Sequence, residues 1–183
     1  MIIGITGTDG AGKGTVVDYL AEKKGFAHYS SRTLLLEELK KTSIVPTRNE
    51  LRLMGNCLRA KHGDDVIVEK ALTQITLNQD ECAVVESIRA IAEANTLKRH
   101  GGILLAVDAD PQLRYERVQM RRSEKDQVTF EEFIAHEEIE KNDPEPHGMQ
   151  KAAVIEMSDF VIKNNGTLEE LHTQIEAFLN KVA

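Results

Sequence analysis

The sequence predicts an α/β fold in which helices cover both faces of a parallel sheet of five strands. Short apolar segments alternate with segments of helical periodicity from one end of the chain to the other. The apolar segments are continuous rather than interleaved with polar residues, which is typical of parallel strands buried on both faces. Together these two patterns favour a sheet enclosed between two layers of helices.

The strands are expected where short apolar runs lie between turn-forming residues. The first begins almost at the N-terminus and is followed by the first helix. The predicted strands cover residues 2–5, 26–30, 82–86, 103–107 and 160–162.

The helices of the first hundred residues are marked by their ends. Gly25 stands where a glycine commonly closes a helix, and Thr47 with Glu50 forms a capping box at a helix start. Asp64 or Asp65 is expected to cap the next helix. The predicted helices cover residues 15–24, 33–41, 47–62, 65–78 and 90–100.

The later helices also have recognisable starts. Asp110 followed by Pro111 combines a carboxylate cap with a proline in the first turn. Capping boxes at 129–132 and 167–170 predict a helix that reaches residue 141 and a final helix at the C-terminus. Residues 143–148 contain two prolines and a glycine and are predicted to form a loop.

Length and composition indicate one domain that covers residues 1–183. The formal net charge of -7 and the pI of about 5.4 argue against a general nucleic-acid binder, which needs a basic surface. The apolar runs are too short to span a bilayer, and the N-terminus shows no signal-peptide pattern. A cytoplasmic protein without a nucleic-acid or membrane partner is therefore expected.

The cysteines and histidines predict no metal centre. Cys57 and Cys82 stand apart without a paired-cysteine motif, so reduced thiols are expected. None of the six histidines has another ligand at a metal-binding spacing. A zinc site is not expected.

The strongest signal for function is the segment from Gly7 to Thr15, which follows the first strand and opens the first helix. Glycines let backbone N–H groups approach phosphate oxygens, and the helix N-terminus adds unpaired donors and a favourable dipole. Lys13 supplies a cation for the β- and γ-phosphates. The sequence therefore predicts an ATP site formed by Thr8, Asp9, Gly10, Ala11, Gly12, Lys13, Gly14 and Thr15.

Gly14 stands where most such loops carry the hydroxyl residue that ligates Mg²⁺. The Gly12-Lys13-Gly14-Thr15 version resembles that of adenylate kinase and related nucleotide kinases. The resemblance implies that Thr15 lies by the α-phosphate and that phosphates and water hold most of the Mg²⁺. Thr15 and Glu86 are the candidate protein ligands for the metal.

The same resemblance, to small P-loop nucleotide kinases, covers most of the chain. It implies a sheet with strand order 2-3-1-4-5, an acceptor-binding helical segment at 33–78 and a short lid at 114–141. It also implies that Asn165 and Gly166 lie against the adenine.

Two lid arginines are expected to take part in catalysis. Arg117 and Arg121 are four residues apart on one helical face. They resemble the lid arginines that cover the base and clamp the γ-phosphate, where phosphoryl transfer needs converging cations. The alternative is a solvated, salt-bridged helix. Arg114 and Arg122 are expected to be structural.

The acceptor site is predicted at the carboxyl ends of the strands, where open α/β sheets bind ligands. Glu86 closes the third strand and Arg89 follows it, so an acid near the metal water and a phosphate ligand are expected there. Asp9 resembles the loop aspartate of thymidylate kinases, which faces the acceptor sugar, although a solvated loop residue is equally compatible. Arg59 is preferred over Arg32 and Arg48 as an acceptor ligand. Asp108 has no assigned role.

These signals predict a small-molecule kinase with ATP and Mg²⁺ as cofactors and a small phosphoacceptor as partner. A nucleoside or deoxynucleoside monophosphate is the first choice. Dephospho-coenzyme A kinase is the alternative, but Ser30-Ser31-Arg32 stands where that family places an aspartate base. A regulatory domain that binds ATP without an acceptor is the alternative of another class. The sequence predicts no oligomeric state.

Overall fold

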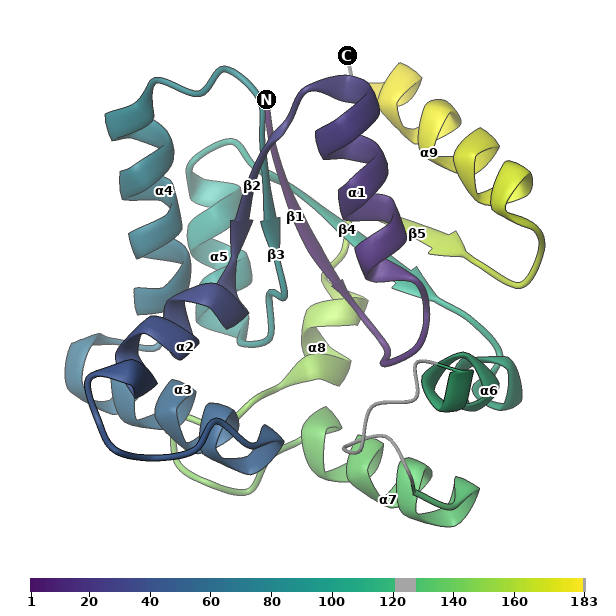
Figure 1. The fold of residues 1–183 in the computed structure, drawn as a ribbon. Helices are drawn as coiled ribbons and strands as arrows, with labels where there is room; N and C mark the ends of the chain where they lie inside the picture. Colours follow the sequence, from purple (N-terminus) through teal and green to yellow (C-terminus); the bar gives the residue numbers. More distant parts are fainter. Residues whose placement is uncertain (121–127, 183) are drawn as a thin grey trace.

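A computed structural model describes residues 1–120 and 128–182. Its centre is a five-stranded parallel sheet in the order β2-β3-β1-β4-β5, which confirms the predicted fold and strand order (Figure 1). The strands are β1 (Ile2–Gly7), β2 (Ala27–Ser30), β3 (Ala83–Glu86), β4 (Ile103–Asp108) and β5 (Phe160–Lys163).

Helices follow the strands and connect them in the parallel direction. The helices of the described residues are α1 (Lys13–Lys24), α2 (Ser31–Lys40), α3 (Arg48–His62), α4 (Val66–Asn78), α5 (Ile91–Arg99), α6 (Pro111–Met120), α7 (Phe130–Lys141), α8 (Lys151–Glu156) and α9 (Leu168–Val182). None of them combines the length and apolar character needed to cross a bilayer.

The sheet lies between two helical layers, each with its own apolar core. On one face, α1 and α9 pack over Ile3 and Ile5, which are fully buried. On the other face, α4, α5 and α8 pack over Val85 and Leu104. Both faces of the strands are covered, which is why the strands are continuous apolar runs.

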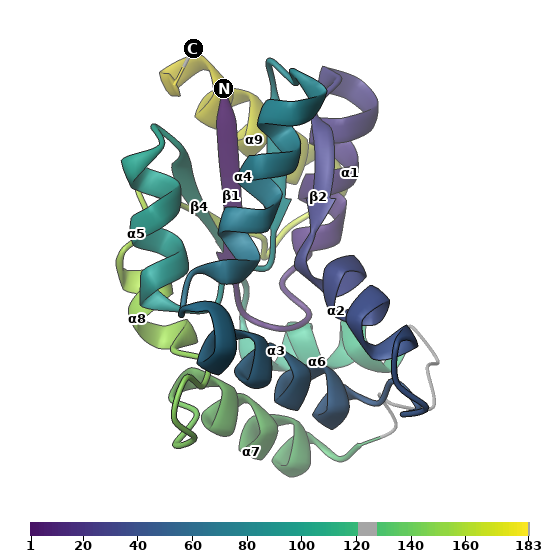
Figure 2. The ribbon, with the colours of Figure 1, turned by 90° about the vertical axis from the view of Figure 1, so that its left-hand side faces the viewer.

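Four further helices lie beyond the carboxyl ends of the strands. Helices α2 and α3 lie on one side of this end, and α6 and α7 lie on the other (Figures 1 and 2). The loop between β1 and α1 lies between the two pairs (Figure 1). The candidate site is therefore enclosed by helices that stand outside the three layers.

Most predicted helix ends are confirmed. Thr47 accepts a hydrogen bond from the Glu50 amide, and the capping boxes at 129–132 and 167–170 have both of their hydrogen bonds. Gly25 closes α1 in the left-handed conformation.

Three details of the prediction were wrong. Helix α1 begins at Lys13, two residues early, because Gly12 takes the N-cap position. Asp65 precedes α4 but makes no side-chain cap, because its carboxylate accepts a 2.7 Å hydrogen bond from Thr96 instead. Helix α8 was not predicted, since six residues are too few to show a helical period.

Candidate functional site

The phosphate loop joins β1 to α1 and has a conformation that requires glycine. Gly10 and Gly12 have φ values of 78° and 96°. A Cβ at Gly10 would lie 2.4 Å from the carbonyl oxygen of Arg114, and one at Gly12 would lie 2.4 Å from Nδ2 of Asn164. A side chain at either position would both strain the backbone and clash with a fixed neighbour.

Three anchors hold this loop in place. The Thr8 hydroxyl donates to Oδ1 of Asp108 at 2.7 Å, Asn164 Nδ2 donates to the Ala11 carbonyl at 2.8 Å, and Arg114 Nη1 donates to the Asp9 carbonyl at 3.1 Å. Burial alone would raise the pKa of Asp108, but hydrogen bonds from Lys163 and Thr8 lower it below its usual value. A charged Asp108 therefore anchors Thr8, which gives this undecided residue a structural role.

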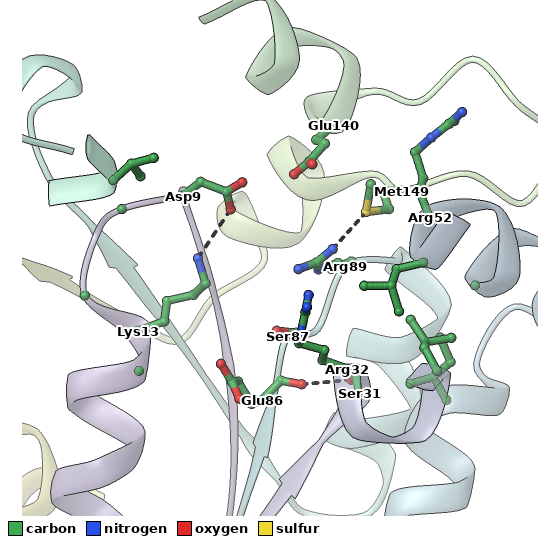
Figure 3. Close-up of a pocket in the computed structure, with 18 of the residues that line it drawn as sticks. Asp9, Lys13, Ser31, Arg32, Arg52, Glu86, Ser87, Arg89, Glu140 and Met149 are labelled. Atoms are coloured by element: carbon green, nitrogen blue, oxygen red, sulfur yellow. Dashed lines mark hydrogen bonds and ion pairs between the residues drawn. The ribbon is translucent and has the colours of Figure 1, made fainter. Parts of the chain in front are cut away.

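Lys13 lies against the loop that it helps to form. Its Nζ donates to the carbonyl oxygens of Gly7 at 3.1 Å and Thr8 at 2.6 Å, and lies 3.7 Å from Oδ1 of Asp9 (Figure 3). Burial lowers the pKa of Lys13 to about 8, and the Asp9 carboxylate opposes this shift. The cation is thus held by two carbonyl oxygens of the loop and lies near the Asp9 carboxylate.

Lys151 at the start of α8 is a second lysine at the loop. Its Nζ donates to Asp9 Oδ1 at 3.1 Å and to Glu140 Oε2 at 2.8 Å, and its side chain is 7% exposed. Glu140 is in the last turn of α7 and is equally buried. Asp9 therefore lies between two lysines from opposite ends of the chain.

A cavity of about 520 Å³ opens beside the loop. Lys13 and Asp9 form one wall of it, and Glu86 lies at its base (Figure 3). An apolar part of the lining comes from α2, α3, α6 and α7, from the start of α4 and from the segment before α8: Leu35, Leu51, Val118, Phe133, Ile67 and Met149. The cavity can therefore accommodate a ligand with both charged and apolar parts.

Guanidinium groups line the wall opposite Lys13. Arg89 and Arg32 reach into the cavity, and Arg52 lies farther from Lys13 (Figure 3). In residues 1–120 and 128–182, the only hydrogen bond of the Arg89 guanidinium goes to Sδ of Met149 at 3.5 Å, and Arg32 has no ion pair. Arg52 is bound to Asp143 at 2.7 Å. Two arginines thus remain available for an anion.

Arg59 lines the cavity but is bound within the protein. Its Nε and Nη2 donate to Oε1 of Glu93 at 3.1 and 2.8 Å, and its Nη1 donates to Asn56 at 3.4 Å. The other Glu93 oxygen accepts from the backbone amides of Arg89 and Ala90. This network fixes the turn that carries Arg89, while a direct contact of Arg59 with an acceptor stays a prediction.

Glu86 ends β3 at the base of the cavity. Its Oε2 lies 3.1 Å from Nε2 of His28, and this hydrogen bond lowers the pKa of Glu86 against the effect of burial. The next residue, Ser87, has a φ of 72°, which is unusual outside glycine. Its strained backbone lies in the cavity lining, as strained residues in functional sites often do.

The protein oxygen atoms near the phosphate loop could supply only part of the coordination shell of a Mg²⁺ ion. Glu86 Oε1 has no hydrogen bond within the described chain and can receive metal-bound water. Thr15 is on the first turn of α1 but does not line the cavity. No cluster of three acidic, histidine or cysteine side chains exists among the described residues, so phosphates and water would complete the coordination.

The predicted adenine side lies apart from the cavity. Arg117 Nη1 donates to the Asn164 carbonyl at 2.8 Å, and Asn165 exchanges two hydrogen bonds with Asp110. Among the described residues, neither Arg117, Asn165 nor Gly166 lines the cavity itself. Arg117 thus lies next to the segment that follows β5, which is the neighbourhood that an adenine site formed by both would require.

Two predicted lid residues lie outside the described residues, namely Arg121 and Arg122, as does the side chain of Arg48. Arg114 is described and is buried against Glu137 of α7 and over the Phe133 ring. Its predicted structural role agrees with these contacts.

Sequence reasoning missed three residues of the site. Arg52 could have been found, because it lies seven residues before Arg59 on the same face of α3. Ser87 follows a strand whose end was already singled out. Lys151 gave no local signal, because its partner Asp9 is 142 residues away.

The chain is similar to several known proteins. The model of the family AAA_18, described as an AAA domain, matches residues 3–145. A UPF0200 protein of Hyperthermus butylicus is 27% identical, with 100% of this chain and 95% of that protein covered. A UPF0200 protein of Methanothermobacter thermautotrophicus is 29% identical, with 100% and 91% covered.

Solved structures share the fold. TT1252 from Thermus thermophilus has a TM-score of 0.61 at 27% identity, and 100% of this chain and 98% of that one are covered. Shikimate kinase from Bacteroides thetaiotaomicron has a TM-score of 0.65 at 14% identity, with 98% of each chain covered. Dephospho-CoA kinase from Campylobacter jejuni has a TM-score of 0.53 at 17% identity, with 100% and 97% covered. The chain therefore belongs to the AAA_18 family.

Proposed function

We propose that this protein transfers the γ-phosphate of ATP to a small acceptor that already carries a phosphate, a nucleoside or deoxynucleoside monophosphate. One observation carries the proposal: Lys13 of the phosphate loop faces the guanidinium groups of Arg32 and Arg89 across one cavity. Neither guanidinium is ion-paired in the described chain. Such an arrangement suits two anionic groups that must meet.

On the ATP side, the amides of the loop and of the first turn of α1 would cradle the phosphates, and Lys13 would follow the β- and γ-phosphates. Arg117 and the tail at Asn165 and Gly166 would hold the adenine. Arg121 keeps its predicted role as a clamp on the transferring group. These groups act by positioning and by neutralising charge, which is the main protein contribution in phosphoryl transfer.

On the acceptor side, Arg89 and Arg32 would bind the acceptor phosphate. Asp9 is proposed to face the acceptor sugar, and Glu86 to lie beside the metal water and the acceptor. Arg59 would support the same site indirectly, because it binds Glu93, and Glu93 in turn fixes the turn that carries Arg89. A direct contact of Arg59 with the acceptor is also proposed. The apolar lining gives a base or other flat group a surface to contact.

The carboxylates of the cavity favour a phosphate acceptor over an alcohol. An alcohol needs a general base, whereas a phosphate oxygen is already a nucleophile. Among the described residues that line the cavity, Asp9 and Glu140 are bound to Lys151, and Glu86 is bound to His28. Asp9 and Glu140 are thus engaged by Lys151, and the hydrogen bond from His28 lowers the pKa of Glu86, which makes Glu86 a weaker base.

Mg²⁺ would bridge the phosphates and neutralise the charge that develops on them. Glu86, through water, and Thr15 are its proposed protein contacts. We also propose that the chain forms one kinase domain, in which residues 33–78 form the acceptor arm and residues 114–141 form the lid. Its support is that both segments line the cavity, through Leu35 and Leu51 on one side and Val118 and Phe133 on the other.

The test is release of ADP from ATP and Mg²⁺ in the presence of a panel of acceptors. The panel contains ribo- and deoxynucleoside monophosphates, the matching nucleosides and dephospho-coenzyme A. We expect stimulation by a monophosphate but not by its nucleoside, and loss of turnover by orders of magnitude in Lys13→Ala. Stimulation by dephospho-coenzyme A alone would support that kinase instead. ATP binding without stimulation by any acceptor would support the regulatory alternative.

A further inference from the structure

Lys151 is a buried cation for which the proposed transfer mechanism has no use. It begins α8, and its amino group lies between the carboxylates of Asp9 and Glu140. A lysine loses its hydration when it is buried, and it is retained only where nearby charges compensate for that loss. The ammonium group of Lys151 and these two carboxylates therefore hold one another in position.

Asp9 places a negative charge inside a loop that binds anions. Its Oδ1 contacts Lys151 at 3.1 Å and lies 3.7 Å from Lys13, so both lysines share one oxygen. In the proposed ATP complex, Lys13 would turn toward the phosphates and its interaction with Asp9 would weaken. Without Lys151, the Asp9 carboxylate would then repel the phosphates more strongly, because like charges close together in a partly buried site are unfavourable.

We propose that Lys151 is a positioning residue of the phosphate loop, which holds the Asp9 carboxylate and compensates its charge while Lys13 serves the phosphates. Glu140 fixes Lys151 from the side of α7, at 2.8 Å. The resulting row of alternating charges, Lys13, Asp9, Lys151 and Glu140, connects the loop to a helix of the lid side. The contact of Arg114 with Asp9 is to the backbone carbonyl and does not replace this role.

This inference rests on ATP binding by the loop and not on the identity of the acceptor. It is therefore tested by the dissociation constant for ATP with Mg²⁺, measured by titration calorimetry on the full chain without an acceptor. The four proteins compared are the wild type, Lys151→Met, Asp9→Asn and the double variant. A thermal melt of each one establishes that it is folded.

We expect Lys151→Met to weaken ATP binding at least about tenfold, or about 1.4 kcal/mol. In the D9N background, the same change should weaken binding by less than about threefold, because the carboxylate beside the phosphates is already gone and the loss of the Glu140 contact is common to both backgrounds. A merely structural lysine would give the same loss in both backgrounds, since its packing is lost in either case. Lys151→Arg, which keeps the charge, should restore most of the affinity.

Lys24→Met is the matched control, because it also removes a lysine that is paired with a carboxylate. Lys24 lies at the end of α1 far from the phosphate loop, and its partner is Glu176 of α9. This variant should bind ATP like the wild type. Equal affinity in folded Lys151→Met, or an equal loss in both backgrounds, would overturn the inference. If Lys151→Met does not fold, Lys151→Gln replaces it with the same expected outcomes. ATP binding without acceptor-stimulated turnover would refute the proposed function alone.

Discussion

Arg52 of α3, which lines the cavity, is joined by an ion pair of 2.7 Å to Asp143, which does not line it. The Asp143 side chain is fully buried, whereas Arg52 remains part of the cavity lining. Burial alone would raise the pKa of Asp143, but hydrogen bonds from Arg52 and from the Glu145 amide lower it below its usual value. The loop after α7 thereby ties the lid side to the acceptor side.

The first prediction concerns this pair. Asp143→Asn should raise the KM for the acceptor severalfold while the dissociation constant for ATP stays within about twofold, because Arg52 loses the charge that orients it. Steady-state kinetics with the acceptor identified by the panel measure the effect. Lys41→Met, which removes an exposed pair with Glu38, is the control. An equal loss in ATP affinity would contradict a role confined to the acceptor side.

The same pair predicts a dependence of stability on pH. A lowered folded-state pKa means that Asp143 stabilises the fold above its unfolded-state pKa of about 4, and that this contribution is lost as the pH falls through the folded value. Asp143→Asn should therefore be less stable than the wild type near neutral pH, and the difference should shrink below about pH 4. Urea denaturation at several pH values measures it. A difference that does not change with pH would contradict this account.

A second prediction compares two glycines of the phosphate loop. Gly12 has a φ of 96° and no room for a Cβ, whereas Gly14 lies in α1 with no atom within 4 Å of an added Cβ. Gly12→Ala should destabilise the fold by more than about 1 kcal/mol, and Gly14→Ala should stabilise it by about 0.5–1 kcal/mol. Thermal denaturation without nucleotide separates the two. Similar melting temperatures for both variants would contradict the loop geometry.

A third prediction follows from the lowered pKa of Lys13, which is about 8. Bound phosphates favour the charged lysine, so ATP binding takes up a proton once the free protein has lost it. Affinity should therefore be highest below about pH 8 and should fall by up to about tenfold per pH unit above it. Lys13→Arg, which stays charged, should show no such fall. Calorimetric titrations between about pH 7 and 9.5 test this, and a flat wild-type profile would contradict it.

A fourth prediction concerns Arg114, which joins α6 to Glu137 of α7 and to the Asp9 carbonyl. Arg114→Met leaves a buried carboxylate without its partner and should cost about 3–5 kcal/mol of unfolding free energy. The double variant Arg114→Met with Glu137→Met should lose less than the single one. Urea denaturation measures the unfolding free energy of the wild type, of both single variants and of the double variant. A double variant as unstable as the sum of the two single ones would argue against a coupled pair.

The fold could be predicted largely from the sequence because its signals are local. Continuous apolar strands, the capping boxes at 129–132 and 167–170 and the glycine after α1 each depend on neighbouring residues only. In two of the three places where the prediction was wrong, a distant partner decided the outcome. Asp65 binds Thr96 rather than capping α4, and the short helix α8 follows from packing of Val154 against the sheet.

The candidate site could be predicted only in part for the same reason. The phosphate loop is one contiguous segment, so its residues were found together. Arg59 was preferred as an acceptor ligand, yet its guanidinium is bound to Glu93, which the sequence cannot show. Lys151 and the Arg52–Asp143 pair depend on contacts across more than ninety residues. Such contacts leave no periodicity or motif in the chain.

The central claim is transfer of the γ-phosphate from ATP to a phosphate-bearing acceptor. Phosphorus NMR of a reaction with ATP, Mg²⁺ and a nucleoside monophosphate tests it most directly, because it observes the product itself. The account predicts that resonances of the nucleoside diphosphate of the acceptor grow together with those of ADP, and that neither grows with Lys13→Ala. ADP accompanied only by inorganic phosphate, at a rate that no acceptor changes, would contradict it.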